Sequence, residues 1–329
     1  YPLTYKCFMP ANSVPRKIAK LPLSICCPKC RSALNQVPNF LICADHNCGA
    51  QYPIVGTCPI LIDERKSVFR IKPIVDSLRP AGTISTYSRL TRLIPPFSNN
   101  IKGRENMLRL KKLLEFRSQK PHGLALGSGD IGYGIEYFRN DKSLELIETD
   151  VKVGAHNRVV CDAHSIPFQD QSFDAVIIQA VLEHVCDPYA CVKEIHRVLK
   201  PEGLVYSETP FMQQVHMGAH DFTRFTHLGH RRLFRQFEAI DDGATCGPGM
   251  SLAWSVYHFL LSFTKSRNAR RFVYLLSSIM TFWLKYVDYF LIDKAGTLDG
   301  ASAFYFLGRR SERVLQDTEV IGLYRGILP

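Results

Sequence analysis

Four cysteines near the N-terminus have the residue type and the spacing of metal ligands. Cys27 and Cys30 form a Cys-Pro-Lys-Cys pair, and Cys43 and Cys48 follow after twelve intervening residues. Two such pairs on neighbouring turns can hold Zn²⁺ tetrahedrally through thiolates at about 2.3 Å. Four thiolates leave no position for water, so this zinc would be structural, and its binding would stabilise a small module. The pattern predicts a zinc module over residues 24–64.

The fourth ligand of this module has two candidates. His46 lies inside the second and wider cysteine pair, where it could replace Cys48. Gly49 favours Cys48, because a glycine directly after the cysteine permits a tight turn. Cys26 and Cys58 are spare candidates.

A glycine turn further along the chain predicts a nucleotide-type cofactor site. The apolar run 123–126 ends in Gly-Ser-Gly-Asp, and an acidic residue closes the next apolar run about twenty positions later. Glycines at such a turn let the backbone approach a ligand, and the carboxylate accepts hydrogen bonds from ribose hydroxyls. The candidate cofactor residues in these two places are Gly127, Ser128, Gly129, Asp130, Gly132, Asp150 and Val151.

Strands and helices that alternate along the chain must position these residues. The segment 188–199 has the clearest helix signals, because Asp187 is a good N-cap, Pro188 suits the first turn and Gly203 follows the end. The alternation predicts an α/β fold with a parallel sheet covered by helices on both faces. The candidate strands are residues 123–127, 144–150, 158–162, 173–179, 203–209 and 304–307.

The remaining segments complete the predicted organisation. We expect an irregular arm over residues 1–23, a connector over 65–105, and the α/β domain over 106–329. Within that domain, residues 251–293 are unusually apolar and aromatic, in two runs that basic residues separate. Each run is shorter than the roughly 20 residues that span a bilayer. They predict an inserted helical pair that covers the site or a dimer face, or that lies on a membrane surface.

The net charge and the distribution of cysteines indicate which partners and which cellular compartment suit this chain. The net charge is +11, and residues 1–122 alone carry 20 basic against 6 acidic residues. Such a surface attracts nucleic acid, an anionic membrane or a phosphorylated substrate, or it simply aids solubility. The other cysteines are scattered singly and no signal peptide is visible, which favours the reducing cytoplasm.

Motifs after the glycine turn resemble those of class I S-adenosylmethionine-dependent methyltransferases. The chain has Leu-Glu-His at 182–184 and Arg-Val-Leu-Lys-Pro-Glu-Gly at 197–203, in the order and spacing of that family. The resemblance implies a Rossmann-like, doubly wound, seven-stranded sheet whose last strand is antiparallel. The cysteine module is similar to small zinc ribbons that end in Cys-Gly-x-x-Tyr-Pro-Ile, here residues 48–54.

The resemblance also implies roles for individual residues. The glycine turn would approach the methionyl part of the cofactor and Asp150 its ribose. Asp162 and Ala163 would face the adenine, and Gln179 would lie beside cofactor and substrate. Two positions depart from the family pattern, because Ala125 and Ile131 stand where an acid and a glycine are usual.

A later segment supplies candidate catalytic residues. Residues 210–226 resemble the Pro-Phe…His…Asp-x-x-Arg-Phe-Thr segment of methyltransferases that accompany glycan and secondary-metabolite biosynthesis. A hydroxyl acceptor must lose a proton, so a base is needed. The candidate bases are His184, His216 and His220, with Asp221 as an orienting partner. Arg224 would hold an anionic substrate group or pair with Asp221.

Three hypotheses for function follow. The first is methyl transfer to a small-molecule acceptor, a hydroxyl of a glycan, lipid-linked or natural-product intermediate. The second is ribosomal RNA methylation with RNA recognition by the zinc ribbon, and the third is a non-catalytic cofactor-binding scaffold. We expect a cytoplasmic protein, with a homodimer or peripheral contact with the inner face of the membrane through residues 251–293 as candidate assemblies.

Overall fold

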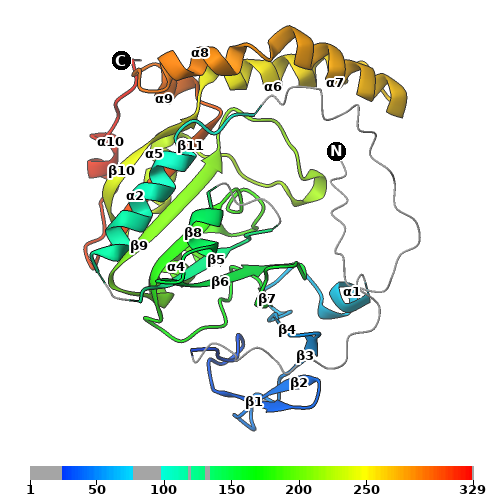
Figure 1. Ribbon diagram of the computed structural model, residues 1–329, viewed down its shortest axis with the longest axis vertical. Helices are drawn as coiled ribbons and strands as arrows, with labels where there is room; N and C mark the ends of the chain where they lie inside the picture. Colours follow the sequence, from blue (N-terminus) through cyan, green and yellow to red (C-terminus); the bar gives the residue numbers. More distant parts are fainter. Residues whose placement is uncertain (1–23, 77–97, 118–119, 130–133, 328–329) are drawn as a thin grey trace.

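One mixed sheet of eleven strands runs through the residues that the computed structural model describes, 24–76, 98–117, 120–129 and 134–327 (Figure 1). Five parallel strands form its centre, and β11 follows them, antiparallel to both of its neighbours. Strand β10 pairs antiparallel with β11 at the edge, and the spatial order is β7 (Val159–Cys161), β6 (Glu145–Asp150), β5 (His122–Leu126), β8 (Phe173–Gln179), β9 (Leu199–Pro210), β11 (Ala303–Arg310) and β10 (Phe237–Cys246). The α/β, Rossmann-like prediction is confirmed.

The predicted count of seven strands was too low, because the N-terminal segment extends the same sheet. Four strands form an antiparallel meander, and the last of them pairs in parallel with β7 through Ile60 opposite Val160 and Leu61 opposite Cys161. They are β1 (Leu34–Val37), β2 (Phe40–Cys43), β3 (Gln51–Val55) and β4 (Cys58–Leu61). Ile60 and Leu61 are fully buried, so the cysteine segment shares its apolar core with the main sheet.

Helices cover both faces of the central strands. On one face α2 (Gly103–Glu115) buries Met107, Leu110 and Leu114 in a cluster with side chains of β5 and β9. On the other face α4 (Pro188–Val198) begins as predicted, since the Asp187 carboxylate accepts a hydrogen bond from the Ala190 amide at 3.0 Å. The shorter helices are α1 (Ile71–Asp76), α3 (Glu136–Arg139), α5 (His227–Leu233), α9 (Thr297–Gly300) and α10 (Asp317–Ile321).

The apolar insertion forms a layer of helices at the end of the molecule opposite β1–β3 (Figure 1). It contains α6 (Pro248–Leu261), α7 (Arg267–Thr281) and α8 (Leu284–Leu291), three helices rather than the predicted pair. The Asp288 carboxylate of α8 accepts hydrogen bonds from the Gly249 and Met250 amides at 2.7 and 2.9 Å, which ties α8 to the start of α6. Among the described residues, no helix has the length and apolar character that crossing a membrane requires.

Candidate functional site

The glycine turn lies where β5 ends, beside the end of β6. Gly127 and Gly129 have φ angles of +62° and +46°, in the left-handed region that favours glycine. The Ser128 amide donates to the Thr149 carbonyl at 3.0 Å, which joins the turn to β6. A Cβ at Gly127 would lie 2.3 Å from Cγ2 of Val181, so the turn depends on glycine both for its conformation and for space.

Asp150 is held in a single orientation at the end of β6. One carboxylate oxygen accepts from the Gly129 amide at 3.0 Å, and the other accepts from the Lys152 amide at 3.0 Å. Burial raises the pKa of this carboxyl. Val151 follows in the same loop, while Asp130 and Gly132 lie outside the described residues. The structure therefore brings together Gly127, Gly129 and Asp150 at the carboxyl ends of two neighbouring parallel strands, where ligands of such sheets bind.

Asp162, in the loop after β7, is engaged by two protein partners. Its carboxylate accepts from the His164 amide at 3.0 Å and lies 2.6 Å from Nδ1 of the same residue. It also accepts from the Ser67 hydroxyl. Although burial acts in the opposite direction, these hydrogen bonds hold the pKa of Asp162 below its usual value. Ala163 is buried beside it. Ser67 comes from the predicted connector, and no sequence signal had singled it out.

Gln179 ends β8 next to the same edge of the sheet. Its side chain hydrogen-bonds Glu208 on β9, which also accepts from Asn100 at 2.9 Å. The following residue, Ala180, has a φ of +52°, which is uncommon for a residue with a Cβ and is frequent near functional sites.

A buried carboxylate and two histidines meet after β8. Glu183 is fully buried, and within the described residues neither of its carboxylate oxygens has a hydrogen-bond partner. Its Oε1 lies 3.5 Å from Nε2 of His184 and 3.9 Å from Nε2 of His216. Burial raises the pKa of Glu183 to about 8 and lowers the pKa of both histidines. The Leu-Glu-His motif contained Glu183, but the sequence analysis selected only its histidine.

Asp221 and His220, the other candidate catalytic residues, contact this cluster through the His216 amide and through the His220 carbonyl. The Asp221 carboxylate accepts from Arg224 and from the His216 amide at 2.9 Å. Burial alone would raise the pKa of Asp221, but the bond from Arg224 lowers it to about 2. The His220 ring stacks on Phe69 with centroids 5.6 Å apart, while its carbonyl lies 2.8 Å from Nδ1 of His184. The His220 ring is therefore turned toward Phe69.

A cavity of about 470 Å³ opens beside the cluster. His258 of α6 contributes to its lining, and Gln214 donates to Ser255 of α6 at 3.1 Å, so the apolar helical layer adjoins the cavity. The other lining residues are Gln213, Val215, Asp221, Phe222, Thr223 and Arg224.

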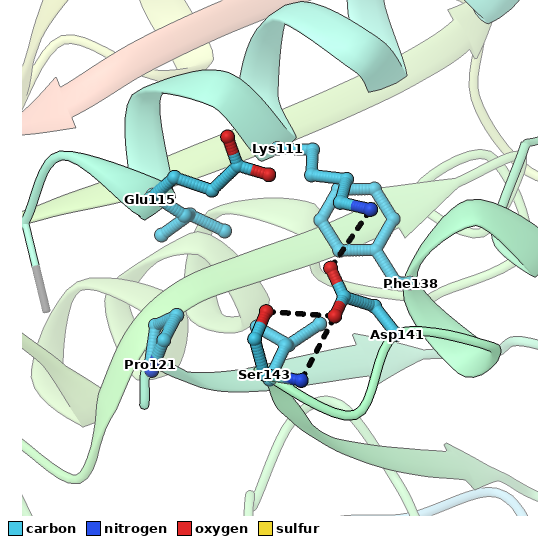
Figure 2. Close-up of a pocket in the computed structure, with 8 residues that line it drawn as sticks. Lys111, Glu115, Pro121, Phe138, Asp141 and Ser143 are labelled. Carbon is cyan, nitrogen blue, oxygen red and sulfur yellow. Dashed lines mark hydrogen bonds and ion pairs between the residues drawn. The ribbon is translucent and has the colours of Figure 1, made fainter. Parts of the chain in front are cut away.

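A smaller cavity of about 170 Å³ lies between α2, α3 and the segments before β5 and β6. Figure 2 shows that Lys111 and Ser143 both hold the Asp141 carboxylate at its edge, with Lys111 Nζ 2.8 Å away. This cavity lies toward the amino ends of the strands, away from the glycine turn.

The four predicted zinc ligands form one cluster. The Sγ atoms of Cys30 and Cys43 lie 3.3 Å apart and those of Cys27 and Cys48 lie 3.8 Å apart. Thiolates around a tetrahedral Zn²⁺ with bonds of about 2.3 Å lie about 3.8 Å apart, so this set suits zinc. All four ligand atoms lie within 4.8 Å of one another.

The remaining candidates for the zinc module lie outside this cluster. Among the described residues, the group at this place that could hold a metal ion contains Cys48 and does not contain His46. Burial raises the pKa of Cys26 to about 11 and that of Cys58 to about 12, which disfavours the thiolate form of both. The hydroxyl of Tyr52, from the Tyr-Pro-Ile tail, lies 3.2 Å from Cys27 Sγ.

Comparisons with known proteins match the segment that contains the glycine turn. Residues 124–207 match a family model described as a methyltransferase domain. The chain is 31% identical over 129 residues to demethylmenaquinone methyltransferase of Thermotoga maritima, covering 36% of this chain and 53% of that protein. It is 37% identical over 90 residues to a ubiquinone/menaquinone biosynthesis C-methyltransferase of Desulfotalea psychrophila, covering 24% and 37%. The chain thus spans about half, or less, of the length of these relatives.

Solved structures give more distant matches. Phosphoethanolamine N-methyltransferase 2 of Haemonchus contortus is 16% identical, with a TM-score of 0.40 over 66% of this chain and 55% of that one. Geranyl diphosphate C-methyltransferase of Streptomyces coelicolor is 13% identical, with a TM-score of 0.40 over 63% and 75%. The family match runs from β5 into β9 and includes the glycine turn, Asp150 and the Leu-Glu-His motif. The segment that runs from β5 into β9 is therefore similar to a methyltransferase domain.

Proposed function

We propose that the protein transfers a methyl group from S-adenosylmethionine to a small lipophilic acceptor. The observation that carries this proposal is the Gly127–Gly129 turn with Asp150 hydrogen-bonded to it, inside the segment that matches a methyltransferase domain. When bound, S-adenosylmethionine supplies a methyl group already activated on a sulfonium. The protein must then align an acceptor with that methyl group, and alignment supplies much of the rate.

Residues of this chain provide each part of the proposed site. Asp150, fixed by two backbone amides, is suited to accept hydrogen bonds from the ribose hydroxyls. Gln179 would line the boundary between cofactor and acceptor, and Ala163 the adenine side. The Ser67 hydroxyl bonded to Asp162 stands beside the proposed adenine site and would have to share that carboxylate with the ligand.

The acceptor hydroxyl would lose its proton at the cluster of Glu183, His184 and His216. Both histidines have a ring nitrogen facing a backbone carbonyl, so Nδ1 carries the hydrogen and Nε2 presents a lone pair. Burial lowers the pKa of both rings, which favours the neutral form that can accept a proton. Asp221 and Arg224 would act as positioning residues, because together they hold the loop that carries His216.

The lipophilic acceptor is supported by the helical layer beside the cavity. Large apolar side chains on these helices and on the turn after α6 face solvent, among them Phe259, Phe263 and Phe290 at 65%, 76% and 79% exposure. Four basic residues, Lys265, Arg267, Arg270 and Arg271, are exposed in the turn from α6 to α7 and along α7. Relatives named for menaquinone and ubiquinone synthesis agree with this class of acceptor.

A methyl-transfer assay tests the proposed activity. With methyl-labelled S-adenosylmethionine, we expect label in a lipid-linked hydroxyl acceptor in anionic vesicles, and less in a water-soluble analogue. His216→Gln should lower kcat by about 10²–10⁴-fold, as loss of a general base does. His196→Gln is the matched control, since this histidine bonds the Ser311 carbonyl away from the cluster. Cofactor binding without transfer to either acceptor would reject the proposed activity in favour of the non-catalytic scaffold. Label in added RNA would reject the lipophilic acceptor in favour of RNA methylation.

Vesicle flotation tests the proposed contact between α6–α8 and a membrane. Exposed phenylalanines that enter lipid each contribute about 1.5–3 kcal/mol. Replacing Phe259, Phe263 and Phe290 by serine should therefore weaken binding to anionic vesicles by about 100-fold or more. Phe116→Ser is the matched control, because Phe116 is 81% exposed at the end of α2. An equal loss of vesicle binding in Phe116→Ser would contradict the membrane proposal. So would a wild-type protein that elutes as a dimer, if the dimer is lost when the three phenylalanines of this layer are replaced.

A further inference from the structure

The geometry points to a divalent transition-metal site formed by Glu183, His184 and His216, separate from the cysteine cluster. One ligand atom from each of the three side chains lies within 4.8 Å of the other two, and Oε1 of Glu183 is 3.5 Å from Nε2 of His184 and 3.9 Å from Nε2 of His216. A carboxylate and two imidazoles with open positions opposite them are a ligand set used for divalent iron and related ions. Ligand atoms bonded to such an ion at about 2.1 Å lie roughly 3–3.5 Å apart, so small side-chain movements would complete the site.

Hydrogen bonding around the two rings supports this assignment. Nδ1 of His184 faces the His220 carbonyl at 2.8 Å, and a carbonyl can only accept, so Nδ1 carries the hydrogen. Nδ1 of His216 faces the Gln214 carbonyl at 3.4 Å and the Asp221 carboxylate at 3.5 Å. Metal-binding histidines are oriented in this way, with the second ring nitrogen bonded to a carbonyl or a carboxylate.

The unpaired carboxylate is the second and independent observation. Glu183 is fully buried, yet neither oxygen has a hydrogen-bond partner within the described residues. Burying such a group without a partner is costly. The Nε2 atoms of His184 and His216 lie 3.5 and 3.9 Å from the same Glu183 oxygen, so three possible metal ligands converge. A cation is the group that would satisfy all three.

The site lies next to the cavity that would receive the acceptor. The His184 and His216 side chains are 17% and 26% exposed, and Asp221, which orients His216, lines the cavity of about 470 Å³. The base of the site is buried and its outer side is open. A bound ion would therefore keep free positions for water or for an acceptor oxygen, as catalytic metal sites do.

This placement deepens the proposed function, on which the following step rests. A bound ion would occupy the Nε2 lone pairs and so take the place of a free histidine base. An acceptor hydroxyl bound to it would lose its proton to water, because coordination lowers the pKa of the hydroxyl. The oxygen then forms a bond to the methyl carbon while the carbon–sulfur bond breaks. The electron pair of that bond goes to sulfur, and the sulfonium becomes a neutral thioether.

Manganese binding to the full chain tests the site without any assay of activity. The protein is first given one equivalent of Zn²⁺ per chain, which the four thiolates take up in preference, because zinc bound at the second site would compete with Mn²⁺. Mn²⁺, which prefers oxygen and nitrogen ligands, is then titrated while free Mn²⁺ is measured by electron paramagnetic resonance. We expect one Mn²⁺ bound per chain. Glu183→Gln and His216→Ala should each weaken binding by about 100-fold or more. His216→Ala changes a partly exposed loop residue, so it keeps the test valid if the buried Glu183→Gln does not fold.

The matched control is His220→Ala, which removes a neighbouring ring but keeps the carbonyl that orients His184. Its Mn²⁺ binding should equal that of the wild type. If the wild type does not bind Mn²⁺, the inference is overturned, and a proton on Glu183 takes the place of the metal. Equal Mn²⁺ binding by all variants overturns the inference as well. Calorimetry with S-adenosylmethionine on the same samples separates the two ideas. Cofactor binding without Mn²⁺ binding rejects only the metal site, whereas Mn²⁺ binding without cofactor binding rejects only the proposed function.

Discussion

Gly127→Ala is expected to abolish S-adenosylmethionine binding while most of the fold remains. The new Cβ would lie 2.3 Å from Cγ2 of Val181, and alanine at a φ of +62° adds about 1–2 kcal/mol of backbone strain. Relief of this clash must move either the turn or Val181, and both flank the proposed cofactor site. We expect calorimetry to show affinity reduced by at least about 100-fold, equivalent to about 3 kcal/mol.

Gly218→Ala is the control for alanine at a positive φ outside the glycine turn. Gly218 has a φ of +58°, yet a Cβ there would meet no atom within 4 Å. Alanine at this position therefore carries the backbone strain without the clash, and its cofactor affinity should stay within about threefold of the wild type. If Gly127→Ala also binds as well as the wild type, the cofactor does not occupy this turn.

Removal of one cysteine from the four-sulfur cluster should release zinc and unfold the N-terminal strands. We propose that Cys27, Cys30, Cys43 and Cys48 hold Zn²⁺, and structural zinc contributes about 10–16 kcal/mol of apparent binding free energy at neutral pH. Cys48→Ser should thus lose the thiolate-to-cobalt charge-transfer band of the cobalt-substituted protein. Since β4 pairs with β7, the Tm of the whole chain should also fall.

Two variants make the zinc experiment specific. Cys186→Ser changes an exposed cysteine outside the cluster, so its cobalt spectrum and Tm should match the wild type. His46→Ala should also keep the spectrum, because His46 is not part of the cluster that the structure describes. A spectrum lost in His46→Ala and kept in Cys48→Ser would reverse the assignment of the fourth ligand.

The elements that were predicted correctly depend on local signals. The start of α4 follows from Asp187 and Pro188, which act within one helical turn. The glycine turn and its acidic partner belong to neighbouring strands of one strand–helix–strand unit, so their spacing along the chain already implies proximity. The cysteine pairs likewise carry their geometry in short spacings.

The missed elements lack such local signals. Strand β10 was not predicted, because Glu238, Asp241 and Asp242 interrupt its apolar pattern, and an edge strand tolerates those charges. The extension of the sheet by β4 was also missed. It depends on Ile60 and Leu61 meeting β7 about a hundred residues later, and four consecutive apolar residues alone do not identify the partner strand.

The sequence by itself determined the chemistry that this protein has available: four thiolates, a glycine turn with a carboxylate, and several histidines near the ends of strands. Only the tertiary structure decided which of these groups face one another. Ser67 meets Asp162, and Glu183 meets His216, across long stretches of chain. The physical reason is that such contacts depend on strand order and on the packing of loops from separate elements, whereas residue type and short spacing depend on the chain alone.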